Sequence, residues 1–177
     1  MKRAIKYIIF FLIAFHSSAF ANDCKLDKIK LLANYEDLKL GPAFTVFNIN
    51  PDGSPHTIVG PIEALCGQNN KETGGILLQL SIIDKKVVQI LFETSINNNR
   101  ALFDIANNHY KAGFIKNQNK IDKKETETYT INKSNNLYFY ANFKNENEFL
   151  EILEISSNKY REILGKRLLK EEERLND

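Results

Sequence analysis

The sequence is poor in the residues that build metal sites and redox centres. Among 177 residues there are no tryptophans, one methionine, two cysteines and three histidines. This scarcity excludes a zinc module built on repeated Cys and His ligands, and we expect neither a metal nor a cofactor. The sequence also lacks the motifs of P-loop, dinucleotide-binding, zinc-protease, calcium-binding and serine-hydrolase proteins. No catalytic residue is therefore assigned from a motif.

Long apolar runs are absent as well, but a short one stands at the start. Lys2, Arg3 and Lys6 precede apolar residues over 7–15, and Ala19-Phe20-Ala21 has the pattern of a cleavage site. The run is shorter than the roughly 20 residues that a membrane helix needs. We predict that residues 1–21 are a cleaved secretory signal peptide. The protein should then lie in the periplasm or be secreted, with no membrane anchor after cleavage.

A strong excess of charge of one sign is also missing. The chain has 24 basic and 22 acidic residues, and three of the basic ones fall within the predicted leader. The lysines over 116–124 alternate with Asn, Gln and acids, without an aromatic side chain among them on which a base could stack. We expect no nucleic-acid binding.

The two cysteines, Cys24 and Cys66, both follow the predicted cleavage site. In an exported protein such a pair is most simply a disulfide, worth about 4 kcal/mol for a loop of this length. The alternative is Cys66 as a nucleophile with His56 or His109 as its base, which would leave Cys24 unpaired in an oxidising compartment. We favour the disulfide.

Hydrophobic periodicity predicts helices alternating with pairs of strands. We expect strands over 43–49, 56–59, 76–83, 87–94, 128–131 and 137–143, and helices over 25–34, 99–111 (capped by Asn98 or Asn99) and from Asn145 to about 164. Asn145, three residues before Glu148, resembles a capping box at the start of the last helix. The expected fold is α+β: one domain over 22–165, mainly an antiparallel sheet with helices packed on one face and a long C-terminal helix, followed by a charged, helical tail over 166–177.

Two acidic patterns resemble catalytic pairs and are assigned to the surface instead. Asp104 and His109 are five residues apart, so a helix would not place them on one face. Glu148, Glu151 and Glu154 lie opposite the apolar stripe of the predicted last helix, which indicates a solvated face. We predict that none of these residues is catalytic.

Two segments are candidates for binding a partner. Pro51, Asp52 and Gly53 are residues typical of a β-turn. Together with Ser54 and His56 they are predicted to form a constrained, exposed loop that loses little conformational entropy when a partner docks on it. Tyr138 and Tyr140 share one face of a predicted strand and can anchor a partner protein. The alternative is that a helix simply covers that face.

These observations favour an exported small binding protein without catalytic activity, for example an inhibitor or immunity-type protein that acts on an envelope enzyme. Its partner would be another protein in the envelope or outside the cell. One alternative is an accessory subunit of a cell-envelope or secretion assembly that uses its C-terminal helix or its charged tail as the contact. Another is a hydrolase whose active site uses His56 or His109.

Overall fold

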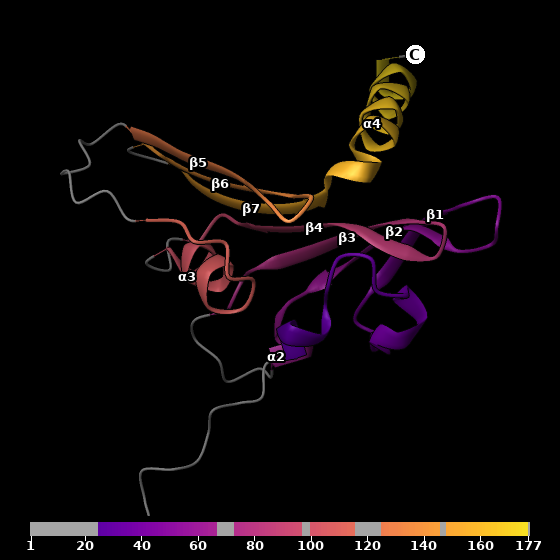
Figure 1. The fold of residues 1–177 in the computed structure, drawn as a ribbon, viewed down its shortest axis with the longest axis horizontal. Coiled ribbons are helices and arrows are strands. Elements are labelled where there is room, and N and C mark those ends of the chain that lie inside the picture. The colour runs from indigo at the N-terminus through magenta and orange to yellow at the C-terminus, as the bar shows by residue number, and fades with distance from the viewer. Residues whose placement is uncertain (1–24, 67–72, 97–99, 116–124, 146–147, 177) are drawn as a thin grey trace, which may run out of the picture.

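The computed structural model describes residues 25–66, 73–96, 100–115, 125–145 and 148–176. Seven strands form one antiparallel sheet in the order β1-β2-β3-β4-β7-β6-β5 (Figure 1). The strands are β1 (Thr45–Ile49), β2 (Pro55–Pro61), β3 (Leu77–Ile83), β4 (Lys86–Thr94), β5 (Glu125–Lys133), β6 (Asn136–Lys144) and β7 (Phe149–Ser157). Two meanders, β1–β4 and β5–β7, join where β4 pairs with β7. This leaves β1 and β5 as the two edges of the sheet.

The hairpin of β3 and β4 confirms the expectation of a central pair. Both strands have a neighbour on each side, and most of their residues are buried. The two-residue turn between them has φ of 50° at Asp84 and 60° at Lys85, the left-handed conformation that a tight hairpin with twisted strands requires. The ladder shifts register between Ser81 and Ile82, which is typical of a β-bulge.

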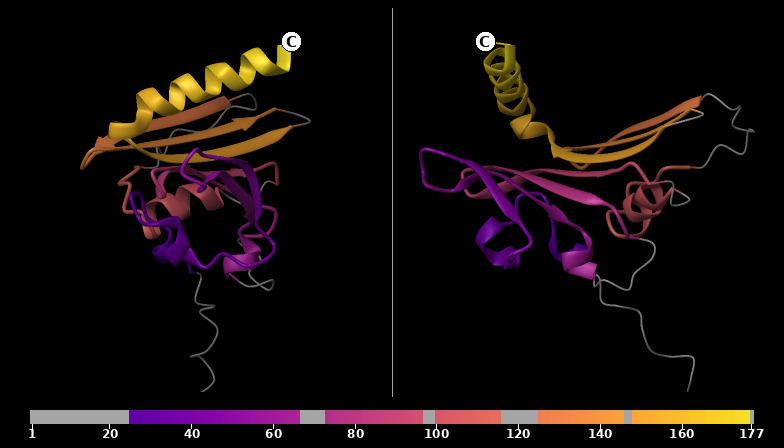
Figure 2. Two further views of the ribbon diagram at one scale, coloured as in Figure 1. Left: turned by 90° about the vertical axis from the view of Figure 1, so that its right-hand side faces the viewer. Right: turned by 180° about the vertical axis from the view of Figure 1, so that it is seen from behind.

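Helices lie on both sides of the sheet (Figure 2). The short helix α2 (Glu63–Cys66) and the helix α3 (Ala101–Asn108) lie on one side, and α4 (Arg161–Asn176) leaves the last strand on the other. The main core contains residues of α2, α3 and the inner strands, including Cys66, Phe103 and Phe92. A second, smaller cluster joins Tyr160 and Leu164 to the β3–β4 hairpin.

The segment predicted as a helix over 25–34 forms one turn of 3₁₀ helix, at Lys25–Lys28, and a second turn follows it at Tyr35–Leu38. Between them the backbone pairs with the start of β4: the Leu32 amide donates to the Val87 carbonyl, and the Val87 amide donates to the Ala33 carbonyl. The apolar spacing that indicated a helix buries Leu26 and Ile29 in the core. A 3₁₀ turn places residues three apart on one side equally well.

The largest correction concerns residues 149–157, predicted as a helix and found as β7. Its run of Phe, Leu and Ile fits both periods, and pairing with β4 and β6 decides between them. The Asn145–Glu148 pattern is also present in the structure, with the Glu148 amide donating to Asn145 Oδ1 at 2.7 Å. Here it closes the connection between β6 and β7 instead of beginning a helix.

The C-terminal helix begins at Arg161, well after its predicted start, and runs through Gly165 to Asn176. It therefore crosses the boundary expected between domain and tail. No described helix is long and apolar enough to span a membrane. The predicted signal peptide and the proposed helix caps Asn98 and Asn99 lie outside the described residues.

Candidate functional site

The edge strand β1 differs from the interior strands because all five of its residues are exposed. Three of them are large and apolar, with exposed fractions of 46% for Val46, 52% for Phe47 and 62% for Ile49. No charged residue occurs between Lys39 and Asp52. Edge strands usually carry charges or prolines that discourage pairing with another chain. Within its bounds β1 has neither, so its edge is chemically open to another strand.

The backbone of β1 has hydrogen-bonding groups that face away from the sheet. The Ile62 amide donates to the Ile76 carbonyl at 3.0 Å, which continues the register of β2 against β3. Because bonding alternates along a strand, the even-numbered residues of β2 bond to β3 and the odd-numbered ones face β1. Thr57 and Val59 lie opposite Phe47 and Thr45, whose amide and carbonyl groups therefore point to β2. The amide and carbonyl groups of Val46, between them, point outward from the sheet.

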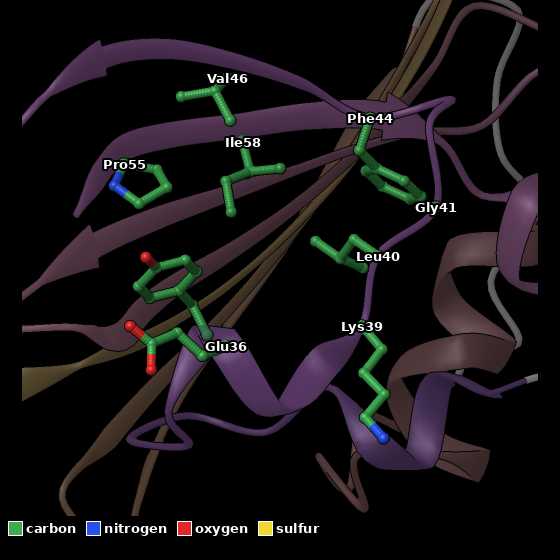
Figure 3. Close-up of a pocket in the computed structure, with 9 residues that line it drawn as sticks. Glu36, Lys39, Leu40, Gly41, Phe44, Val46, Pro55 and Ile58 are labelled. Carbon is green, nitrogen blue, oxygen red and sulfur yellow. The ribbon is translucent and has the colours of Figure 1, made fainter. Parts of the chain in front are cut away.

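A pocket of about 270 Å³ opens beside this strand, which we call the edge pocket (Figure 3). It is lined by Tyr35, Glu36, Lys39, Leu40, Gly41, Phe44, Val46, Pro55 and Ile58. Figure 3 shows Val46 and Ile58 on the strands, with Leu40 across the space from them. Its walls near β1 are thus apolar, and its charged groups come from the 3₁₀ turn over 35–38 and the residue after it.

The shape of the edge pocket depends on a glycine beneath it. A methyl group on Gly60 of β2 would lie 2.5 Å from Cδ1 of Phe44, which is much closer than van der Waals contact. The absence of a side chain at Gly60 therefore lets the Phe44 ring lie flat against the sheet. Any larger residue at that position would push the ring away and change the pocket.

Three of the residues that the sequence analysis selected for partner binding lie in the turn after β1, and the fourth, His56, lies in β2. Asp52 and Gly53 are exposed, and Gly53 has φ of 79°. Ser54, in contrast, is 1% exposed and donates its hydroxyl to Asp52 Oδ1 at 2.6 Å, while its amide donates to the same oxygen at 3.0 Å. These bonds, the hydroxyl's first, lower the pKa of Asp52. His56 is half-buried, with Nδ1 3.0 Å from Thr57 Oγ1. The turn is rigid, and it offers a partner Asp52 and Gly53 but not Ser54.

Tyr138 and Tyr140 do not form an exposed binding surface. Their exposed fractions are 9% and 0%, and both belong to the main core. The Tyr140 ring packs edge-on against Phe103 of α3, with centroids 5.3 Å apart. This burial contradicts the expectation that the two tyrosines face a partner, and it agrees with the alternative that a helix covers them.

Glu151, which the sequence analysis assigned to a solvated helix face, is fully buried. Because the segment is a strand, Glu151 points to the core side, where its Oε1 accepts bonds from the Tyr140 hydroxyl at 2.9 Å and from the Leu102 and Phe103 amides at 3.1 and 3.3 Å. The two amides belong to the first turn of α3, where amide groups have no acceptor within the helix. Burial raises the pKa of Glu151, and the bonds from Tyr140 and the helix amides partly oppose this.

An ion pair extends this buried polar cluster to the edge strand β5. Arg100, directly before α3, places Nη2 2.8 Å from Glu127 Oε2, and its guanidinium lies 4.5 Å from the centre of the Phe103 ring. The Tyr129 hydroxyl donates to the other oxygen of Glu127. These contacts tie α3 to both β7 and β5. Sequence reasoning missed the cluster because only a strand at 149–157 brings Glu151 to α3.

The remaining candidates separate into different parts of the fold. Cys66 is buried in α2 and is not a free thiol. Cys24 lies outside the described residues, so the disulfide between them stays a prediction. His109, at the end of α3, has Nδ1 2.9 Å from Asp27 Oδ1. His56 and His109 therefore lie on different elements with different neighbours. Among the described residues there is no group of three or more side chains able to hold a metal ion.

Comparison with protein-family models, with curated proteins and with solved structures finds no match to this chain.

Proposed function

We propose that this protein is an exported binding protein that docks on another protein by taking an extended segment of its partner as an added strand beside β1. The observation that carries this proposal is the combination, at one edge of the sheet, of an uncharged strand that exposes three large apolar side chains with an adjoining pocket whose walls near the strand are apolar. In strand addition, main-chain hydrogen bonds supply affinity and pockets for alternate side chains supply specificity. The edge at β1 has the elements for both.

The partner is a protein of the cell envelope or the exterior, since residues 1–21 have the pattern of a secretory leader. An inhibitor or immunity-type role fits this arrangement. A strand held by the sheet and followed by a rigid turn is already ordered before it binds, so docking costs little conformational entropy. The exposed Asp52 and Gly53 would lie at one end of the added strand and limit how far it extends.

The test begins with a library of random linear peptides displayed on phage and selected against the oxidised protein without its leader. The strongest peptide is then measured against Val46→Pro and Val46→Thr. Proline removes the outward amide of residue 46, while threonine keeps that amide and replaces one methyl group by a hydroxyl. Both suit an edge strand whose amide faces solvent. We expect Val46→Thr to bind measurably and Val46→Pro to lose binding by at least a further tenfold, as the loss of one interfacial hydrogen bond implies.

Equal affinities for the two variants would show that the backbone edge is not used and would contradict strand addition. A peptide whose binding protects the amides of β5, and not those of β1, from hydrogen exchange would also contradict it. Both variants must retain the circular dichroism and thermal unfolding of the parent, which checks that the loss is local. Turnover of a substrate that is abolished by His56→Ala or His109→Ala would favour the hydrolase alternative.

A further inference from the structure

The C-terminal helix α4 is connected to the open edge of the sheet by one arginine. Arg167 donates from Nη1 to the Ile82 carbonyl in β3 and from Nη2 to Oδ1 of Asn50, each at 3.0 Å. Asn50 directly follows β1, and it lies 117 positions from Arg167 in the sequence. The guanidinium of Arg167 thus joins three elements: the β1–β2 hairpin, the neighbouring strand β3 and the helix α4.

Asn50 is suited to transmit this contact to the hairpin. It is 8% exposed, and its Nδ2 lies within hydrogen-bond distance of Ser54 Oγ (3.1 Å), the Pro55 carbonyl (2.7 Å) and the Ile82 carbonyl (3.2 Å). Both the donor and the acceptor ends of this side chain are therefore engaged. A buried amide that loses a partner costs more than the net value of one hydrogen bond, so the arrangement is sensitive to each contact.

The end of β1 needs such support because its own ladder is interrupted. The register between β1 and β2 skips Asn48, whose φ is 56°. Ile49 still lies opposite Pro55, but Pro55 has no amide hydrogen to donate. The last part of the strand is thus held less by the ladder than by Asn50 and its neighbours.

The seat of α4 is small, which makes its position adjustable. Among the side chains that the structure describes, Tyr160 and Leu164 contact Ile83 and Val88 in a cluster of four buried residues. In Figure 1 most of the helix rises away from the sheet. Elements with few buried contacts open at low free energy.

We propose that Arg167 is a positioning residue for the β1 edge, and that the seating of α4 determines through Asn50 whether this edge is ordered. The consequence for binding rests on the proposed function, whereas the coupling between helix and hairpin does not. A partner or modification that lifts α4 would release the hairpin and weaken strand addition. By linkage, an added strand that orders β1 would hold α4 more firmly on the sheet.

Hydrogen exchange on the whole chain without its leader tests the coupling directly. In Arg167→Ala we expect the protected amides over 45–59 to exchange at least about tenfold faster, since a hydrogen bond from a charged donor is lost, while protection in β6 and β7 is unchanged. The matched control is Arg161→Ala, which removes an exposed arginine from the same helix and should resemble the parent. Arg167→Lys can reach only one acceptor well and should restore protection in part.

A double-mutant cycle with Asn50→Ala separates positioning from a general loss of stability. If the two side chains act on the hairpin through each other, the acceleration in the double variant is clearly smaller than the product of the two single effects. Multiplicative effects, or equal acceleration over the whole sheet, would overturn the proposal. So would unchanged exchange over 45–59 in Arg167→Ala.

The selected peptide distinguishes this inference from the proposed function. We expect its affinity to fall about tenfold in Arg167→Ala and to stay unchanged in Arg161→Ala. If no peptide binds the parent at β1, the proposed function fails, and the exchange experiment still decides the coupling. If the peptide binds Arg167→Ala as tightly as the parent, Arg167 does not position the edge.

Discussion

The two edge strands of the sheet, β1 and β5, differ in the chemistry of their exposed side chains. The described, exposed side chains of β5 are threonines, an asparagine and a lysine, and its inward-facing Glu127 is ion-paired with Arg100. Lys133 at its end donates to the Lys111 carbonyl at 2.9 Å. The other edge, β1, has no charge and exposes Val46, Phe47 and Ile49. One edge thus carries polar and charged groups that discourage pairing, while the other lacks them.

This contrast is the reason why the proposed function places the added strand at β1. A fold that is able to protect β5 with charges could protect β1 in the same way, and an exposed apolar edge strand otherwise promotes aggregation. The two edge strands also differ in the tertiary contacts that hold them in place. The α3 cluster ties β5 through its own side chains, whereas β1 depends on Asn50 beyond its end. Substitutions at and around the two edges test this difference.

The largest effect is expected from placing a charge on the open edge. Val46→Lys introduces an ammonium group beside the edge pocket, where an added strand would have to bury it. We expect affinity for the selected peptide to fall at least about a hundredfold by isothermal titration calorimetry, which corresponds to roughly 2.7 kcal/mol. The control, Thr130→Lys, places the same charge on exposed β5 and should leave affinity unchanged. Equal losses in the two variants would remove the distinction between the edges.

A methyl group under Phe44 should disturb both the fold and the edge pocket. Gly60→Ala puts a carbon 2.5 Å from the Phe44 ring, which must move, and we expect the free energy of unfolding to fall by about 1–3 kcal/mol in urea titrations. Gly165→Ala is the matched control because no atom lies within 4 Å of the new methyl, and the substitution favours helix. A stable Gly60→Ala variant with unchanged peptide affinity would show that the placement of Phe44 is unimportant.

Removing the buried carboxylate changes how stability depends on pH. The folded protein raises the pKa of Glu151, so its contribution to stability is complete below the ordinary glutamate pKa and is lost as the pH rises through the raised value. Glu151→Gln retains an oxygen for Tyr140 and the α3 amides without ionising. We expect a flatter stability profile and a gain of roughly 1 kcal/mol at neutral pH. If the stability of Glu151→Gln depends on pH as steeply as that of the parent, the assignment is wrong.

The smallest effect concerns the turn between the two central strands. Lys85 has φ of 60°, and its side chain forms a surface ion pair with Glu36, at 3.4 Å. Lys85→Gly removes the left-handed strain of this position and should raise the free energy of unfolding by about 0.5 kcal/mol. Thermal unfolding measures the gain, and peptide affinity at β1 should not change. Loss of stability would show that the Lys85–Glu36 pair outweighs the strain.

The sequence predicted the local hairpins and missed what depends on distant partners. The β3–β4 pair and its turn follow from two apolar runs separated by Asp84 and Lys85, because all the determinants lie close together along the chain. Residues 149–157 were assigned to a helix because their apolar spacing fits both periods. Only the neighbouring strands, contributed by 86–94 and 136–144, select the extended form. Because of this error, Glu151 was predicted on a solvated helix face, whereas the structure buries it in the core.

The candidate site was also predictable from the sequence only in part. The Pro-Asp-Gly turn and the absence of charge from Gly41 to Pro51 are properties of the sequence. Three other properties are set by the tertiary structure: the position of β1 at a sheet edge, the edge pocket beside it and the hydrogen bond from Arg167 to Asn50. Each of them joins segments that lie far apart in the chain. The sequence by itself determined the turn chemistry, the predicted export and the central hairpin. The tertiary structure decided which strand remains without a neighbour, because an edge is defined only by the pairing of all the other strands.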